Sequence, residues 1–189
     1  MNNAHDKDVH AAKFVALKQR GADALITPHR GCVLPAVRIA RKISEARVTV
    51  VIPTRNRREL LESCIASMEP ARRRREFDII TVDNESSDPN ALDYLSSIDR
   101  PQTKVVRAAG DPNVARQYSL ASARAEGDHL CLLNHRVQAL DDEWLEEMLG
   151  RMWSADVGAV GALLSWPSGV VQNGVIASYA MCAQNGQTC

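Results

Sequence analysis

The chain has 189 residues, of which 45% are hydrophobic and 24% charged, and this ordinary globular composition excludes a disordered chain. Its 23 basic and 23 acidic residues leave no formal net charge, which argues against a general nucleic-acid binder. No apolar run approaches the roughly 20 residues that cross a bilayer, and the first ten residues lack the apolar core of a secretory signal.

The N-terminal section has a mixed, weakly periodic pattern that differs from the rest of the chain. Asp8–Arg20 has apolar residues on one face of a predicted helix, which Gly21 would end. Short β-like pieces broken by prolines and glycine follow. We therefore expect an arm over residues 1–46, made of a helix plus short β pieces, and a main domain over residues 47–189.

From Arg47 onwards, short apolar runs alternate with amphipathic segments. The expected strands are Val48–Ile52, Phe77–Val82, Lys104–Ala108, His129–Leu133, Gly158–Leu164 and Val170–Ile176. The expected helices are Arg57–Met68, Pro89–Ile98, Asn113–Ala125 and Asp141–Met152. Alternation of this kind implies crossover connections, and so an α/β fold with a mainly parallel central sheet.

Polar and charged residues follow three of these strands at the point where each strand ends. Thr54 and Arg55 follow the first strand, Asp83 ends the second, and Asn134-His135-Arg136 follows the fourth. The carboxyl ends of parallel strands meet at one edge of the sheet, where open α/β folds bind their ligands. These three strand ends predict a nucleotide site.

Five pieces of the chain occur together in one order and spacing. They are VTVVIPTRNRRELLESCIASM, FDIITVDNESSDPNALDYL, HLCLLNHRV, DDEWLEEML and VGAVGALLSWPSGVVQNGVI. Together they resemble the family 2 glycosyltransferases, from about Arg47 to about Ile176. The arm is similar to the segment that precedes this domain in large bacterial polysaccharide-assembly transferases. The resemblance implies the GT-A nucleotide-sugar fold, a Rossmann-like sandwich with a mainly parallel sheet, here truncated at the C-terminus with an incomplete acceptor half.

The resemblance also implies which residues contact the nucleotide. Pro53, Thr54 and Arg55 would border the base, and Asp83 would accept hydrogen bonds from the base or ribose, since an ionised carboxylate only accepts. Asp83 has a structural alternative, which is to cap the loop that follows it. Arg55 stands where the family usually has an aromatic, and a guanidinium also stacks on a base plane. The full set of expected nucleotide-site residues is Pro53, Thr54, Arg55, Asp83, Asn84, Asn134, His135 and Arg136.

The third strand end departs from the family pattern. The family reads Leu-Asn-Asn-Asp or Asp-x-Asp there, and the last Asp ligates Mg²⁺ or Mn²⁺ that bridges the diphosphate; this chain reads Leu133-Asn134-His135-Arg136. We therefore expect no metal ligand at this position. Arg136 has three interpretations: it contacts the diphosphate directly, it marks a site that no longer binds a sugar donor, or it is an ordinary surface arginine. His135 is read as a loop residue that faces the ribose.

The resemblance implies an inverting transfer of a sugar from a UDP- or dTDP-sugar to a glycan or a lipid-linked acceptor. The family's catalytic base is an Asp well beyond the fifth strand, so no residue here is assigned as the base and little activity is expected. The alternative is a non-catalytic nucleotide-binding or scaffold module in polysaccharide assembly. Five cysteines without a CxxC pair fit a cytoplasmic location. Peripheral association with the inner membrane and association with a partner enzyme are the alternatives that stay open.

A run of four arginines, Arg72–Arg75, precedes the second strand. It is expected to be a solvated loop between a helix and a strand, with the steering of an anionic donor or contact with acidic lipids as the alternatives.

Overall fold

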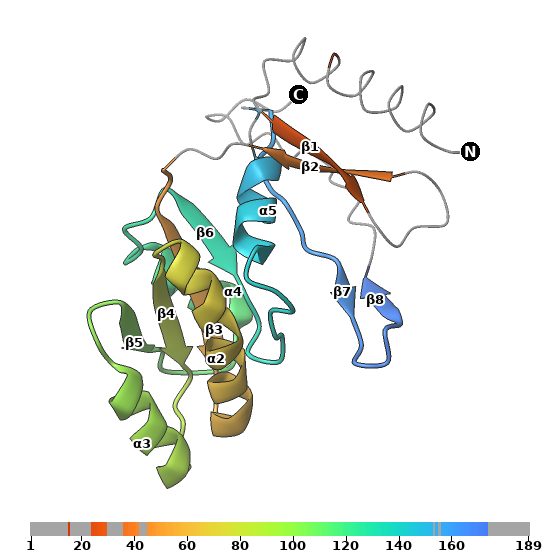
Figure 1. Cartoon of the computed structure of the whole chain (residues 1–189). Coiled ribbons are helices and arrows are strands. Elements are labelled where there is room, and N and C mark those ends of the chain that lie inside the picture. Colours follow the sequence, from red (N-terminus) through yellow and green to blue (C-terminus); the bar gives the residue numbers. More distant parts are fainter. Residues whose placement is uncertain are drawn as a thin grey trace, which may run out of the picture. The chain divides into compact units, whose positions relative to one another are not determined.

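A computed structural model describes residues 15, 24–29, 36–41, 45–152, 154 and 156–173 (Figure 1). By its contacts the chain divides into two compact units. One is continuous and spans Glu45–Trp144, and the other combines Met1–Ser44 with Leu145–Cys189. The first boundary lies close to the expected division after residue 46, whereas the residues after Trp144 group with the N-terminal segment. Whether the expected parts 1–46 and 47–189 fold independently stays a prediction.

A four-stranded parallel sheet forms the centre of the continuous unit. Its strands are β3 (Val48–Thr54), β4 (Asp78–Asp83), β5 (Thr103–Arg107) and β6 (His129–Leu132), in the order β5-β4-β3-β6. All seven residues of β3 are buried, as expected for a central strand covered on both faces. This sheet confirms the predicted α/β class and the mainly parallel arrangement.

Helices cover both faces of this sheet. They are α2 (Arg58–Arg74), α3 (Pro89–Ile98) and α4 (Val114–Ser122), and α2 and α4 lie on opposite faces (Figure 1). The α4 side is a cluster of Val51, Ile80, Val82, Ala108 and Ala121, with Tyr118 packed against it. The apolar stripe predicted for α2 from Leu60 to Met68 is buried except at Leu60, which is 37% exposed. Its buried members are Leu61, Cys64, Ile65, Met68 and Ala71. Asp88 caps α3 by accepting from the Asn90 amide, and Pro89 follows it at the first helical position.

The arginine run belongs to a helix, so its interpretation as a solvated loop was wrong. Helix α2 continues through Pro70 to Arg74, and Arg75 is its C-cap. The side chain of Arg72 is only 19% exposed, and its guanidinium donates to the Gln102 carbonyl at 2.8 Å. Arginine has high helix propensity, and here its long side chain also finds acceptors across the sheet, so the helix gains from continuing.

The two predicted C-terminal strands do not extend the central sheet. Residues 158–163 are irregular, and only Leu164–Ser165 (β7) is a strand. It pairs antiparallel with β8 (Val171–Asn173) in a separate hairpin, and the expected residues 174–176 lie outside the described part. Helix α5 (Trp144–Arg151) begins three residues later than expected.

The N-terminal section contains an antiparallel pair, β1 (Ala24–His29) and β2 (Ala36–Arg41), which agrees with the short β pieces expected there. The helix expected over Asp8–Arg20 lies outside the described residues except at Val15, which is helical. Every helix in the described part of the chain is too short or too polar to cross a bilayer.

Candidate functional site at the carboxyl edge of the sheet

Two of the expected residues lie side by side where β3 and β4 end. Thr54 pairs in register with Asp83, so their side chains leave the same face of the sheet. Both are buried, with 5% and 1% of their surfaces exposed. The Asn84 amide donates to the Thr54 carbonyl at 3.0 Å, which holds the two strand ends together. The sequence therefore placed a hydroxyl and a carboxylate correctly at one edge.

Asp83 uses one of its two carboxylate oxygens to hold a loop. Oδ1 accepts from the Ser86 amide at 3.1 Å, which is the structural role considered for this residue. Oδ2 is buried and has no hydrogen-bond partner among the described residues. A buried oxygen without a partner is costly, so the loop alone does not explain the carboxylate. The unpartnered Oδ2 therefore indicates that Asp83 has a further binding partner.

Asn84, expected to contact the nucleotide, is used to build the scaffold. Its Nδ2 donates to the carbonyls of Ala108 and Gly110, and its Oδ1 accepts from Nε2 of Gln117 at 2.6 Å. The residue is 3% exposed and leaves the opposite face of the sheet from Asp83. Asn84 therefore anchors the loop after β5 to α4, and it is not placed to touch a ligand next to Asp83.

Pro53, near the end of β3, contacts His135, which lies in the turn after β6. Nδ1 of His135 lies 2.8 Å from the Pro53 carbonyl oxygen, and because that oxygen only accepts, Nδ1 must carry the proton. A neutral imidazole then has an unprotonated Nε2, which is buried without a partner in the described part. The Leu133 amide still donates to the Val51 carbonyl at 2.9 Å, and Pro53 has no N–H to continue the ladder between β3 and β6, which ends there.

The remaining expected residues lie on the surface of this edge. Arg55, Asn134 and Arg136 are exposed, and no hydrogen bond or ion pair joins either guanidinium to another described residue. The Asn134 side chain accepts from the Arg136 amide at 3.0 Å, which shapes the turn after β6. Both arginines are therefore available to an anion, although the structure gives no contact that fixes where they point.

Two residues missed by the sequence analysis organise the edge. Gln117 holds Asn84, and Asn56 bridges the loop after β3 and the loop after β4. The backbone of Asn56 lies in the left-handed region, with φ 50°. Asparagine adopts that conformation more readily than other non-glycine residues, so an Asn directly after a buried strand was a usable signal. Nothing in the helical pattern around Gln117 marked its role.

Within the part of the chain that the structure describes, three buried polar atoms at this edge have no hydrogen-bond partner: Thr54 Oγ1, Asp83 Oδ2 and His135 Nε2. They supply a hydroxyl that both donates and accepts, a carboxylate acceptor and an imidazole acceptor. Buried polar atoms are normally paired, so a group of three at one sheet edge suits a ligand that carries both donors and acceptors.

The turn after β6 carries no carboxylate over residues 133–140 that could ligate a divalent cation. A hard cation of the Mg²⁺ or Mn²⁺ type takes several oxygen ligands. The turn after β6 offers an amide, an imidazole and the exposed cation Arg136, and no group of three His, Cys, Asp or Glu that could hold a metal occurs within the described residues.

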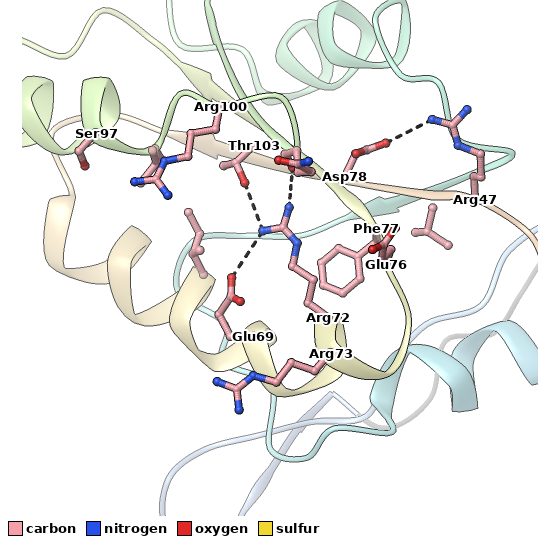
Figure 2. Close-up of a pocket in the computed structure, with 14 residues that line it drawn as sticks. Arg47, Glu69, Arg72, Arg73, Glu76, Phe77, Asp78, Ser97, Arg100 and Thr103 are labelled. Atoms are coloured by element: carbon pink, nitrogen blue, oxygen red, sulfur yellow. Dashed lines mark hydrogen bonds and ion pairs between the residues drawn. The ribbon is translucent and has the colours of Figure 1, made fainter.

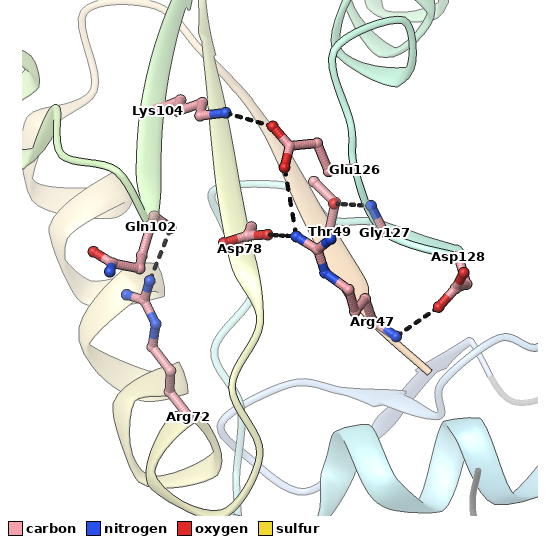
Figure 3. Close-up of polar contacts among 9 residues, drawn as sticks. All are labelled: Arg47, Thr49, Arg72, Asp78, Gln102, Lys104, Glu126, Gly127 and Asp128. Atoms are coloured by element: carbon pink, nitrogen blue, oxygen red, sulfur yellow. Dashed lines mark hydrogen bonds and ion pairs between the residues drawn. The ribbon is translucent and has the colours of Figure 1, made fainter. Parts of the chain in front are cut away.

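A hollow of about 900 Å³ lies at the other end of the sheet, where β3, β4 and β5 begin (Figure 2). Its central arginine, Arg72, already donates to Gln102 and Thr103 and pairs with Glu69. Arg47, at its rim, lies 3.6 Å from Asp78 in a charged network (Figure 3). These arginines serve the packing of the sheet's amino end, so the hollow is a weaker candidate than the carboxyl edge.

The parallel sheet with helices on both faces and a polar carboxyl edge defines a GT-A type of nucleotide-diphospho-sugar transferase fold. Over 82% of its length, the chain is similar in structure to a mannosyltransferase from Pyrobaculum calidifontis that was solved with GDP-Man and Mn²⁺. The TM-score is 0.51, the sequence identity is 16%, and the match covers 43% of that chain. The family model "Glycosyl transferase family 2" matches residues 49–176. The chain belongs to this family, as the resemblance predicted.

Two curated relatives cover most of this chain but little of their own length. A Sinorhizobium fredii protein named "Uncharacterized protein y4gI" is 30% identical over 142 residues, which is 74% of this chain and 16% of the relative. The O-antigen biosynthesis protein RfbC of Myxococcus xanthus is 29% identical over 129 residues, 67% of this chain and 10% of the relative. The chain therefore corresponds to a small part of these longer proteins.

Proposed function

We propose that the chain is the nucleotide-sugar-binding part of a family 2 glycosyltransferase, and that it binds a UDP- or dTDP-sugar at the carboxyl edge of its sheet. A glycan or a lipid-linked molecule is the proposed acceptor, in polysaccharide biosynthesis, in keeping with the name of the Myxococcus relative as an O-antigen biosynthesis protein. The observation that carries the proposal is the group of unpartnered atoms on Thr54, Asp83 and His135.

The chemistry of a pyrimidine nucleoside matches these atoms. Uracil and thymine each present one imide N–H between two carbonyls, so Asp83 Oδ2 is a suitable acceptor for the N–H and Thr54 Oγ1 a suitable donor to a carbonyl. The acceptor Nε2 of His135 suits a ribose hydroxyl. All three atoms are buried in this conformation, so binding requires a displacement of the loops that cover these strand ends.

The diphosphate would meet exposed arginines. Arg55 and Arg136 flank the same edge, and a guanidinium binds phosphate oxygens through paired hydrogen bonds. Since the turn after β6 carries Arg136 and no carboxylate, we propose that nucleotide binding does not depend on Mn²⁺. With no base assigned, sugar transfer by this chain alone is proposed to be slow or absent.

The second candidate is a nucleotide-binding scaffold without catalysis, and the exposed Arg136 in place of a metal-ligating carboxylate favours it. The two candidates differ in turnover, not in binding. Release of UDP from a panel of UDP-sugars in the presence of Mn²⁺, well above the rate without protein, would support the enzyme. Nucleotide binding without turnover supports the scaffold.

Calorimetric titration with UDP, in Mn²⁺ and in EDTA, tests the shared part of the proposal. We expect binding of similar strength in both buffers, and a loss of about tenfold or more in Asp83→Asn, which places an amide donor opposite the imide N–H. Asp78→Asn is the matched control, because it makes the same change at the other end of the same strand. Equal binding by wild type and Asp83→Asn would contradict the assignment.

A further inference from the structure

The loops after β3 and β4 share an uncommon backbone conformation. Asn56 has φ 50° and Glu85 has φ 52°, and both lie in the described part of the chain directly after the strand ends that carry Thr54 and Asp83. Left-handed backbone is unfavourable for residues other than glycine, and it persists where surrounding contacts hold it. The contacts that Asn56 makes therefore indicate what holds this backbone conformation in place.

The side chain of Asn56 reaches from the first loop to the second. Its Oδ1 accepts from the amides of Ser87 and Asp88 at 2.7 and 3.0 Å, and its Nδ2 donates to the Ser87 hydroxyl at 3.3 Å. Its backbone amide donates to the Ser86 hydroxyl at 2.9 Å. Through its side chain and its backbone amide, the exposed Asn56 thus makes four hydrogen bonds to three consecutive residues of another loop.

The second loop is in turn connected to Asp83 and to α3. The Ser86 amide donates to Asp83 Oδ1, and Asp88 caps α3 through the Asn90 amide at 3.0 Å. The unpartnered oxygen of Asp83 is therefore oriented through Ser86, whose hydroxyl accepts from the Asn56 backbone amide and whose neighbours Ser87 and Asp88 are held by the Asn56 side chain. Replacing that side chain removes the bonds to Ser87 and Asp88 and leaves the core strands untouched, because Asn56 is exposed.

We propose that Asn56 is a positioning residue: it fixes the loop 85–88 against the end of β3 and so holds Asp83 for the nucleotide. This rests on the proposed function for its ligand, but the contact between the loops stands on the geometry alone. Asn56 itself is not assigned a contact with the nucleotide.

Four variants separate hydrogen bonding from backbone strain. Asn56→Ala removes the side-chain contacts and keeps a Cβ, whereas Asn56→Gly removes the contacts and relieves the left-handed strain. Asn56→Asp keeps an oxygen to accept from the two loop amides. Asn90→Ala is the control, since Asn90 is exposed nearby and its side chain makes no hydrogen bond among the described residues.

Two measurements are made on each variant: the affinity for UDP, and hydrogen exchange of the Ser87 and Asp88 amides. We expect Asn56→Ala and Asn56→Gly both to bind about tenfold more weakly and to exchange these amides faster, at nearly unchanged melting temperature. Asn56→Asp is expected to keep both amides protected from exchange. Its affinity is measured for uridine in place of UDP, because uridine has no diphosphate for the new carboxylate to repel. Asn90→Ala behaves as wild type.

The outcomes distinguish this inference from the proposed function. Wild-type binding that survives in Asn56→Ala and Asn56→Gly overturns the positioning role and leaves the nucleotide site standing. A normal affinity in Asn56→Gly alone would mean that backbone strain, not the side chain, matters. A wild-type chain that binds no UDP refutes both the site and the role of Asn56 in binding. Unchanged amide exchange in Asn56→Ala and Asn56→Gly refutes the contact between the loops.

Discussion

Gly127, in the connection between α4 and β6, has no room for a side chain. A Cβ at this position would lie 2.8 Å from the Thr49 amide nitrogen and 2.9 Å from the Val48 carbonyl carbon. Those atoms belong to the backbone of the central strand β3, where Val48 and Thr49 are 2% and 1% exposed. The Gly127 amide also donates to Thr49 Oγ1 at 3.2 Å (Figure 3). Gly127→Ala must therefore displace the connection or the strand.

The cost follows from these two contacts. Overpacking a buried site by a methyl group costs about 1–3 kcal/mol, and the weakened hydrogen bond adds about 0.5–1.5 kcal/mol. A loss of about 1.5–4.5 kcal/mol is expected for the unit Glu45–Trp144, which has roughly 100 residues. For a domain of that size each kcal/mol lowers the melting temperature by about 4–8 °C, so a fall of about 6 °C or more is expected.

Urea unfolding followed by circular dichroism measures this loss directly. Gly158→Ala is the control, because nothing lies within 4 Å of a Cβ at Gly158 and the change tests only the general effect of replacing glycine with alanine. We expect the midpoint of Gly127→Ala to fall and that of Gly158→Ala to stay close to wild type. A Gly127→Ala protein as stable as wild type would refute the close approach of the connection to β3.

Three further predictions concern charged and thiol side chains. Arg72→Ala should destabilise the chain by about 2 kcal/mol, since it loses two hydrogen bonds across the sheet and a contact 5.7 Å from an aromatic ring. The hydrogen bond and charge of Lys104 lower the pKa of Glu126, so the stabilisation it gives is present above the ordinary glutamate pKa of 4.5 and is lost as the pH falls through the lowered value. Burial raises the pKa of Cys64 to about 12 and of Cys131 to about 11, so both should resist alkylation at pH 8 until the chain unfolds.

Each of these has a direct check. Arg73→Ala, an exposed change on the same helix, should leave the urea midpoint unchanged, and an equal loss in both arginine variants would contradict the role of Arg72. Glu126→Gln should differ from wild type near neutral pH but not at strongly acidic pH, and less so in high salt. Peptide-resolved alkylation reports the two cysteines separately, and rapid native labelling of Cys64 would be inconsistent with its burial.

The continuous unit was largely predictable because its pattern is strong and local. The strand before Pro53 and the helix after Pro89 carry clear signals: a buried β-branched run, and an aspartate cap with proline at the first helical position. The C-terminal strands were not predictable in this way. The run from Gly158 is apolar but most of it is exposed and irregular, and an apolar run alone does not say which strand it will pair with.

The candidate site shows the same division between position and role. Strand ends placed Thr54 and Asp83 at one edge, because parallel strands present their carboxyl ends together. The sequence did not show that Asn84 would turn to the opposite face and bind Gln117, since that depends on an α4 helix distant in the chain. Asn56 escaped notice because its contacts are with a loop about thirty residues away.

The most direct test of the central claim is a nuclear magnetic resonance titration of the ¹⁵N-labelled chain with UDP. The account predicts shifts of the backbone amides at residues 54–57, 83–88 and 134–136, with little change around the hollow at the amino end of the sheet. Shifts confined to residues 69–73 and 100–103 would place the nucleotide in that hollow and contradict the assignment of the carboxyl edge.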